Sequence, residues 1–295
     1  MINYNPKNWI TLIFSFDKSD TFRMLWKELV YIGLLSSLIT FLEIHFFPKA
    51  EGLKNLIAVY SLLGFVISLL LVFRTNTAYD RWWEGRKTWG GIVNDSRNLA
   101  SKLNAILGDN LSEKKWFAAM ISNFSYASKE HLRGSFNLEE LVLQNDQDKL
   151  AIQNAEHKPL WVIKRIRERI TELYKQGVIK PEDLYVLDKN LNALIDAIGA
   201  CERIKNTPIP YSYSLFIKKF IFIYVITLPL AFVNLFGYYS ALIATFVFYA
   251  LVSMEVLAEE IEDPFGEDDN DLPTGQISAT IRSNVNELLG VQKVD

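Results

Sequence analysis

The sequence predicts an all-α integral membrane protein with four membrane-spanning helices and a further helical region outside the membrane. Half of its 295 residues are hydrophobic, and they are concentrated in two zones, roughly 29–73 and 215–254. Each zone is long enough for two crossings of about 20 residues each. The stretch between the zones has an ordinary soluble composition, and alternating strand patterns are scarce in it.

The spans are expected at about 25–45, 54–79, 212–236 and 238–258. Several charged residues lie near the ends of these spans, among them Lys27, Glu28, Lys218 and Lys219. Such side chains can reach the membrane surface or can face protein instead of lipid. The alternative is a set of buried helices in a large soluble protein, but four such apolar runs in two hairpins are many for a soluble core.

The region at about 80–208 is expected to be helical and cytoplasmic. Its predicted helices cover about 80–106, 112–132, 158–176 and 181–205, and Gly177 and Pro181 mark two of their ends. An acidic loop and a tail follow at 259–295.

The distribution of Lys and Arg predicts the orientation in the membrane. The N-terminal segment contains Lys7, Lys18 and Arg23, and the middle region is also basic, whereas residues 234–240 contain no Lys or Arg. The positive-inside rule therefore places both termini and the middle region in the cytoplasm. The first residues lack the pattern of a signal peptide.

No motif for covalent chemistry is found in the sequence, so we expect no enzyme. The three histidines, His45, His131 and His157, are far apart, and no HExxH, GxSxG, P-loop or GxGxxG pattern occurs. The single cysteine, Cys201, excludes an internal disulfide and is expected to be a buried thiol. Nucleic-acid binding is not expected either, because basic residues alternate with acidic ones along 161–176.

The second apolar span carries a ridge of large side chains. Phe65, Leu69 and Phe73 recur at i, i+4 and i+8, and the same side continues to Thr77 and Asp80. A helix that lines a water-filled path needs such a polar continuation, whereas a helix that faces lipid does not. The spacing alone also fits a helix buried among its own partners.

Small residues and tryptophans mark two other places on this helix. Gly64 and Ser68 have the small-xxx-small spacing that lets a neighbouring helix come close. Trp82 and Trp83 follow the apolar run, where tryptophan prefers the membrane interface.

An acidic segment, "EEIEDPFGEDDNDLP", follows the fourth span at 259–273. Carboxylates gathered in this way attract cations, which can be Ca²⁺ or the Arg and Lys side chains of the protein itself. The segment is not an EF-hand loop, because counting from Asp268 gives Pro273 at the sixth position and Ala279 at the twelfth. A metal site and a loop held by salt bridges both remain open.

Three stretches together resemble the bestrophin family of ion channels, in its bacterial branch. They are "FRTNTAYDRWWEGRKTWG" at 73–90, "GACERIKNTPIPYSY" at 199–213 and "EDPFGEDDNDLP" at 262–273. The resemblance extends over about 20–290.

The resemblance implies that residues 1–295 form a single bestrophin-like domain and that the chain assembles as a homopentamer around one pore in the bacterial inner membrane. Small monovalent ions, chloride by family default, would pass a hydrophobic neck formed by Phe65, Leu69 and Phe73. A sodium channel of the same architecture is one alternative. A non-conducting membrane scaffold or a secondary transporter is another.

The resemblance also implies two further sites. A second constriction would lie at the cytoplasmic mouth, between Ile179 and Leu184. The acidic stretch corresponds to a calcium clasp of animal members at four positions, two of which match its acidic ligands (Asp268 and Asp271), whereas Asp263 and Glu260 stand where the animal motif has Asn and Gln. The tail after Thr274 resembles a strap onto a neighbouring subunit. The four acidic positions are Glu260, Asp263, Asp268 and Asp271. Bacterial members generally lack calcium control, so the expected partners are membrane lipid, inorganic ions and further copies of the chain, with no certain cofactor.

Overall fold

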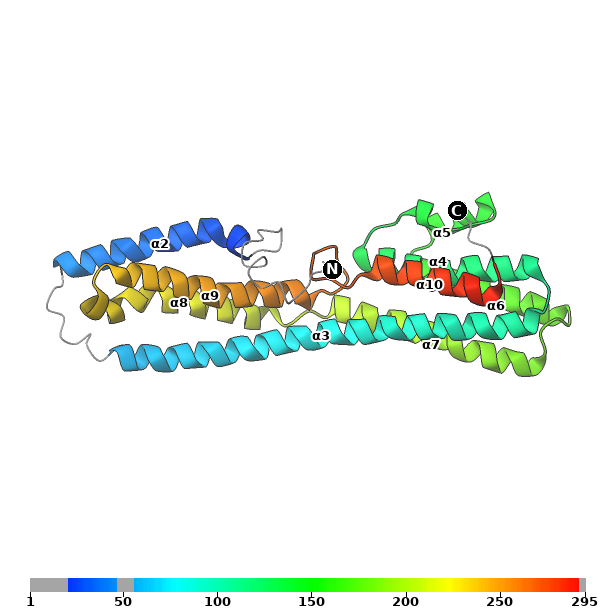
Figure 1. Cartoon of the computed structure of the whole chain (residues 1–295), viewed down its shortest axis with the longest axis horizontal. Coiled ribbons are helices and arrows are strands. Elements are labelled where there is room, and N and C mark those ends of the chain that lie inside the picture. Colours follow the sequence, from blue (N-terminus) through cyan, green and yellow to red (C-terminus); the bar gives the residue numbers. More distant parts are fainter. Residues whose placement is uncertain (1–20, 47–55, 292–295) are drawn as a thin grey trace. The chain divides into compact units, whose positions relative to one another are not determined.

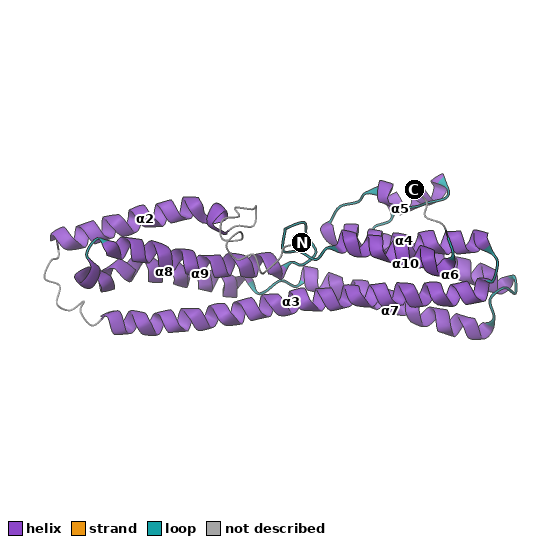
Figure 2. Cartoon of the chain, viewed as in Figure 1, coloured by secondary structure: helices purple, strands orange, loops and turns teal. Residues whose placement is uncertain are grey.

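The computed structural model describes residues 21–46 and 56–291, and the regular structure in them is entirely helical (Figure 2). The all-α prediction is confirmed. In chain order the helices are α2 (Thr21–Phe46), α3 (Leu56–Leu107), α4 (Leu111–Arg133), the 3-10 turn η2 (Leu138–Glu140), α5 (Asp146–Asn154), α6 (Lys158–Lys175), α7 (Pro181–Asn206), α8 (Tyr211–Phe236), α9 (Tyr239–Glu262) and α10 (Thr274–Leu289) (Figure 1). The basic residues Lys7 and Lys18 and the first residues of the second predicted span lie outside the described residues.

The chain divides into two compact units, which we call the apolar unit and the polar unit. The apolar unit consists of the described parts of 1–82, 208–263 and 268–270, and the polar unit consists of those of 83–207, 264–267 and 271–295. The long helix α3 contributes to both units, and the division falls between Trp82 and Trp83.

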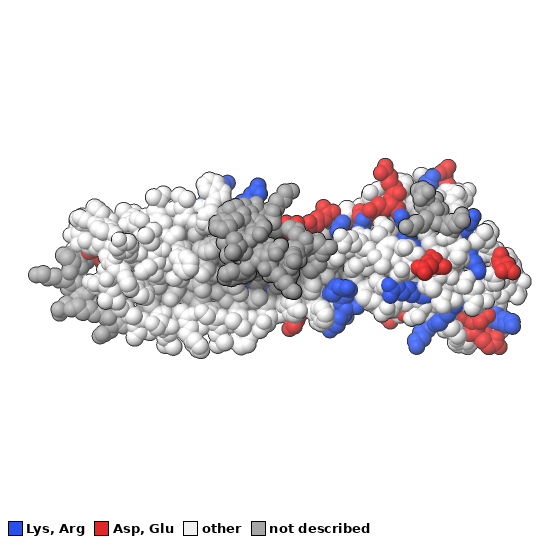
Figure 3. All heavy atoms as spheres, in the orientation of Figure 1, with Lys and Arg blue, Asp and Glu red and all other residues white. Residues whose placement is uncertain are grey.

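Four helices of the apolar unit, α2, α3, α8 and α9, are long and apolar enough to cross a membrane. On the face drawn in Figure 3, charged side chains are sparse over α2, α8 and α9, whereas both signs of charge are frequent over the polar unit. Because a helix satisfies its own backbone hydrogen bonds, these segments can enter lipid without leaving polar backbone groups unpaired.

Tyrosine hydroxyls connect α3 to α8. Tyr60 donates to the carbonyl oxygen of Thr227 at 2.9 Å, and Tyr224 donates to the carbonyl oxygen of Tyr60 at 3.3 Å. Gly64 makes room for this contact, because a Cβ atom there would lie 2.8 Å from the Tyr224 hydroxyl. The close approach predicted at Gly64 is therefore present, and it joins two helices of one chain.

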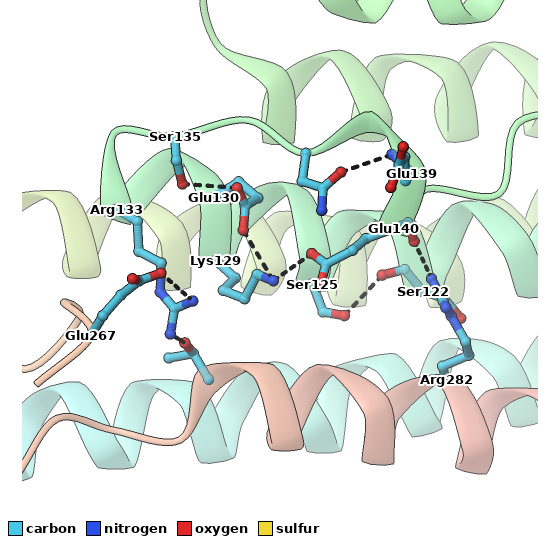
Figure 4. Close-up of polar contacts among 12 residues, drawn as sticks. Ser122, Ser125, Lys129, Glu130, Arg133, Ser135, Glu139, Glu140, Glu267 and Arg282 are labelled. Atoms are coloured by element: carbon cyan, nitrogen blue, oxygen red, sulfur yellow. Dashed lines mark hydrogen bonds and ion pairs between the residues drawn. The ribbon is translucent and has the colours of Figure 1, made fainter. Parts of the chain in front are cut away.

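In the polar unit, α4 packs against α6, α7 and α10. A group of charged side chains fixes the C-terminal part of α4 (Figure 4). The ammonium group of Lys129 contacts Glu130 at 3.0 Å and also binds Glu140. Burial alone would lower the pKa of Lys129, but its hydrogen bonds with Glu140 and Glu130 outweigh burial and raise the pKa.

The C-terminal helix α10 packs on α4 of its own chain. Ile281, Val285 and Leu289 are buried in the polar unit. Arg133, at the end of α4, donates to Thr274 at 3.3 Å and pairs with Glu267 at 3.3 Å (Figure 4). The expected strap onto a neighbouring subunit remains a prediction, and only the outer face of α10 is available for it.

A buried arginine fixes α3 to α9 within the apolar unit. The side chain of Arg74 is 1% exposed, and its Nη2 donates to Oε2 of Glu262 at 2.7 Å. Its Nε lies 3.6 Å from Oε1 of Glu255, a carboxylate that is 2% exposed. Glu262 also accepts a hydrogen bond from the backbone N–H of Ile209 at 2.6 Å.

Replacing Arg74 with Ala should strongly destabilise the protein, because two largely buried carboxylates then lose their cation. Breaking a buried pair from one side costs about 3–5 kcal/mol. The matched control is Lys218→Ala, which breaks the half-exposed pair between Lys218 and Glu259 and should cost at most about 1 kcal/mol. Melting temperatures of the detergent-solubilised variants will compare the two, and equal losses would contradict a dominant role for Arg74.

Candidate functional site

The predicted ridge on α3 points away from the core of its own chain. Phe65, Leu69 and Phe73 are 66%, 44% and 56% exposed, whereas Ile67 and Leu71 on the same helix are 1% and 3% exposed. The interpretation of the ridge as core packing within one chain is therefore wrong. Three large apolar side chains are left to face lipid, another subunit or a pore.

Polar side chains continue the ridge beyond Phe73. Asn76, Thr77 and Asp80 are all exposed on α3. The Thr77 hydroxyl donates to the carbonyl oxygen of Phe73 at 2.9 Å, so it stays close to the helix backbone. The exposed side of α3 thus changes from apolar to polar in the way that the sequence suggested for a water-filled path.

Sequence reasoning missed Arg74 as the residue that holds this part of α3. The sequence did contain a pattern that indicates this pairing, because Arg74 directly follows the apolar run and the end of α9 is rich in acids. The sequence allowed those acids to bind Arg and Lys from elsewhere in the protein, but it did not identify which ones.

The other acids near the end of α9 also have protein partners. Glu259 pairs with Lys218 at 2.5 Å, so this lysine has a partner within its own chain. Glu260 accepts a hydrogen bond from Nδ2 of Asn270 at 2.6 Å. The backbone carbonyl of Asn270 in turn accepts a hydrogen bond from Nε1 of Trp82 at 3.0 Å, so this tryptophan helps to hold the acidic loop.

Three residues of the predicted calcium clasp, Glu260, Asp263 and Asp268, lie in the apolar unit, and Asp271 lies in the polar unit. The first three do not form a group whose ligand atoms all lie within 4.8 Å of one another. The carboxylate of Asp271 is buried in the polar unit, where it approaches Gly266. A side chain on Gly266 would collide with it, since a Cβ atom there would lie 2.7 Å from Oδ2 of Asp271.

The two residues predicted for a cytoplasmic constriction differ in exposure. Ile179 is 1% exposed, and its side chain is covered by its own chain. A covered side chain presents no surface to a pore, so the structure gives no support to Ile179. Leu184, in the first turn of α7, is half-buried and remains the residue on which this prediction depends.

The polar unit contains one cluster that the sequence did not reveal. His131 and His157 both contact the same carboxylate oxygen of Glu202, although the three residues are widely separated in the sequence. Next to Glu202 lies Cys201, which is buried as predicted. Burial, with the nearby carboxylates of Glu202 and Glu84, raises the pKa of this thiol to about 12.

The sequence as a whole is similar to a known family. The family model for "Bacterial/Fungal Bestrophin protein" matches residues 1–287. A voltage-dependent anion channel-forming protein of Nostoc sp. is 34% identical over 289 residues, which are 96% of this chain and 92% of that protein. A protein of the same description from Escherichia coli (strain K12) is 32% identical over 231 residues, 78% of this chain and 76% of that one.

Solved structures lead to the same family. The crystal structure of a bacterial bestrophin homolog from Klebsiella pneumoniae has a TM-score of 0.84 and 27% sequence identity. The match covers 91% of this chain and 100% of that chain. With its four apolar helices and this agreement along nearly the whole sequence, the chain is a membrane protein that belongs to the bacterial and fungal bestrophin family.

Proposed function

We propose that this chain forms an anion channel whose narrow part is built from the exposed ridge of α3. The proposal is supported by the relatives, which are named voltage-dependent anion channel-forming proteins. These relatives are channels and not enzymes. The observation that carries the proposal is the outward orientation of Phe65, Leu69 and Phe73 on a helix whose exposed side then becomes polar.

A pore of this kind requires several copies of the chain. One ridge cannot enclose a path, but identical ridges around a symmetry axis can, and closed rings are the usual form of homo-oligomers. We propose the homopentamer that the family resemblance implies. Each of Phe65, Leu69 and Phe73 would then form one apolar ring.

Apolar rings control ions by controlling water. A hydrated ion crosses a narrow apolar segment reluctantly, because the segment dewets and the ion sheds part of its hydration. Phenylalanine presents a positive ring edge to an anion and a negative face to a cation. We favour chloride because the relatives are named anion channels, and sodium passage is the alternative outcome of the test below.

Calcium is not part of the proposed mechanism. Glu259, Glu260 and Glu262 bind Lys218, Asn270 and Arg74, which are groups of the protein itself. These contacts support a loop and helix end held by internal partners, with no need for a metal ion at these positions.

The proposed location is the inner membrane, with both termini in the cytoplasm. Four crossings bring the two ends of a chain to the same side. The basic residues Lys7, Lys18 and Arg23 favour the cytoplasmic side for these ends.

Truncating Phe65, Leu69 and Phe73 together to Ala should raise the unitary conductance or activate a silent channel. The triple substitution widens the apolar segment and eases its wetting. Single-channel recordings in planar bilayers will measure the effect. The matched control is the double variant Ile67→Ala and Leu71→Ala, which alters the buried side of the same helix.

The control should lose stability, by about 2–5 kcal/mol for each substitution, because it opens cavities in the core. Its unitary conductance should stay near that of the wild type if it assembles. A ridge variant that assembles but conducts as the wild type does would refute the proposed neck.

Assembly and selectivity are tested on the purified wild type. Light scattering corrected for bound detergent should give about five times the chain mass of 33.9 kDa, and a monomer would remove the shared pore. Under a gradient of NaCl, the reversal potential should lie near the equilibrium potential of chloride. A value near that of sodium would establish the cation alternative, and the absence of current would favour a scaffold.

A further inference from the structure

The His131–His157–Glu202 cluster (the three side chains named above) joins three separate segments of the polar unit. His131 lies in the last turn of α4, His157 caps the N-terminus of α6, and Glu202 lies on α7. Nε2 of His131 is 2.6 Å and Nε2 of His157 is 2.7 Å from the same atom, Oε1 of Glu202. Two ring nitrogens and one carboxylate oxygen therefore converge on one point.

We propose that this cluster binds a divalent first-row transition metal ion of the zinc type. Among the described residues, these three form a group of metal-ligating side chains whose ligand atoms all lie within 4.8 Å of one another. Imidazole and carboxylate ligands in this combination suit Zn²⁺, whereas Ca²⁺ and Mg²⁺ prefer oxygen ligands alone.

The site needs only a small adjustment to accept the ion. Ligands about 2.0–2.1 Å from a tetrahedral zinc ion are about 3.3 Å apart. The nitrogen–oxygen distances of 2.6 Å and 2.7 Å must therefore open by less than 1 Å. The three side chains are 26%, 28% and 29% exposed, so solvent can supply the ion and a fourth ligand.

The basic residues next to the cluster in the sequence bind other groups of the protein and do not pair with Glu202. Lys158 donates to the carbonyl oxygen of Ala155 at 3.3 Å, and Arg203 pairs with Glu84 at 3.3 Å. Lys205 binds the carbonyl oxygen of Leu132. Among the described ion pairs, Glu202 is paired with histidines alone.

The two imidazole rings lie next to each other, 4.4 Å apart between centroids and tilted by 31°. Both Nε2 atoms approach Glu202 from neighbouring positions, so one metal ion could bind both rings as neutral imidazoles together with the carboxylate.

Metal binding has a cost that the structure identifies. Nδ1 of His157 accepts the backbone N–H of Leu160 at 3.2 Å, which assigns the ring proton to Nε2. A metal ion on Nε2 moves that proton to Nδ1, so the first turn of α6 gives up this cap. The free energy gained from the metal–ligand bonds must exceed the free energy lost with this cap hydrogen bond.

The experiment uses the full chain, purified in detergent, stripped with a chelator and titrated with Zn²⁺ and Co²⁺ by calorimetry. One ion should bind per chain, and Zn²⁺ should raise the melting temperature. His131→Gln and Glu202→Gln should each weaken binding by about 100-fold or more, since changes outside the ligand shell already cost 10–100-fold. The controls are His45→Gln, on α2, and Glu182→Gln, exposed on α7, and neither should change the affinity.

A spectrum of the wild type tests the site without any variant. Co²⁺ should give visible bands of a nitrogen and oxygen ligand set, without a thiolate charge-transfer band, because Cys201 is buried. The proposal would be overturned if the Co²⁺ spectrum lacks visible bands, if metal binding does not saturate, or if the variants and the controls lose metal affinity equally. The proposal would also be overturned by a combination of three results: the wild type binds no metal, its melting temperature shifts between pH 8 and pH 5.5, and His131→Gln abolishes that shift. The cluster would then bind a proton and not a metal ion.

Discussion

The buried guanidinium of Arg74 is the interaction on which the proposed pore depends. The ridge residues of α3 face away from their own chain, so their packing cannot hold the helix in place. Arg74 directly follows Phe73 and is fixed by Glu255 and Glu262 of α9. Nearer the start of α3, hydrogen bonds of the Tyr60 and Tyr224 hydroxyls join this helix to α8. The other side of α3 is thus anchored by these polar contacts together with the buried side chains of Ile67 and Leu71.

Periodicity identified the helices and the ridge, but it could not decide what the ridge faces. Apolar runs of sufficient length predict membrane helices, and the spacing of Phe65, Leu69 and Phe73 places these side chains on one side. Spacing does not indicate which side of a helix its neighbours cover. That information came from the burial of Ile67 and Leu71 in the structure.

Contacts between distant segments were beyond the reach of the sequence. His131, His157 and Glu202 meet because three helices of the polar unit pack together, and no local pattern records that packing. The pairing of Arg74 with the acids of α9 was accessible only as a general expectation. The short elements η2 and α5 were also missed, because they lack a long apolar period.

The burial of the only cysteine has a practical consequence for work on this protein. A thiol with a pKa of about 12 is almost entirely protonated at neutral pH, and Cys201 is also closed to solvent. We therefore expect Cys201 to react with alkylating reagents and spin labels far more slowly than an exposed cysteine. A single cysteine placed at any exposed position of α3 would report on that position alone, and the native sequence needs no prior replacement of Cys201.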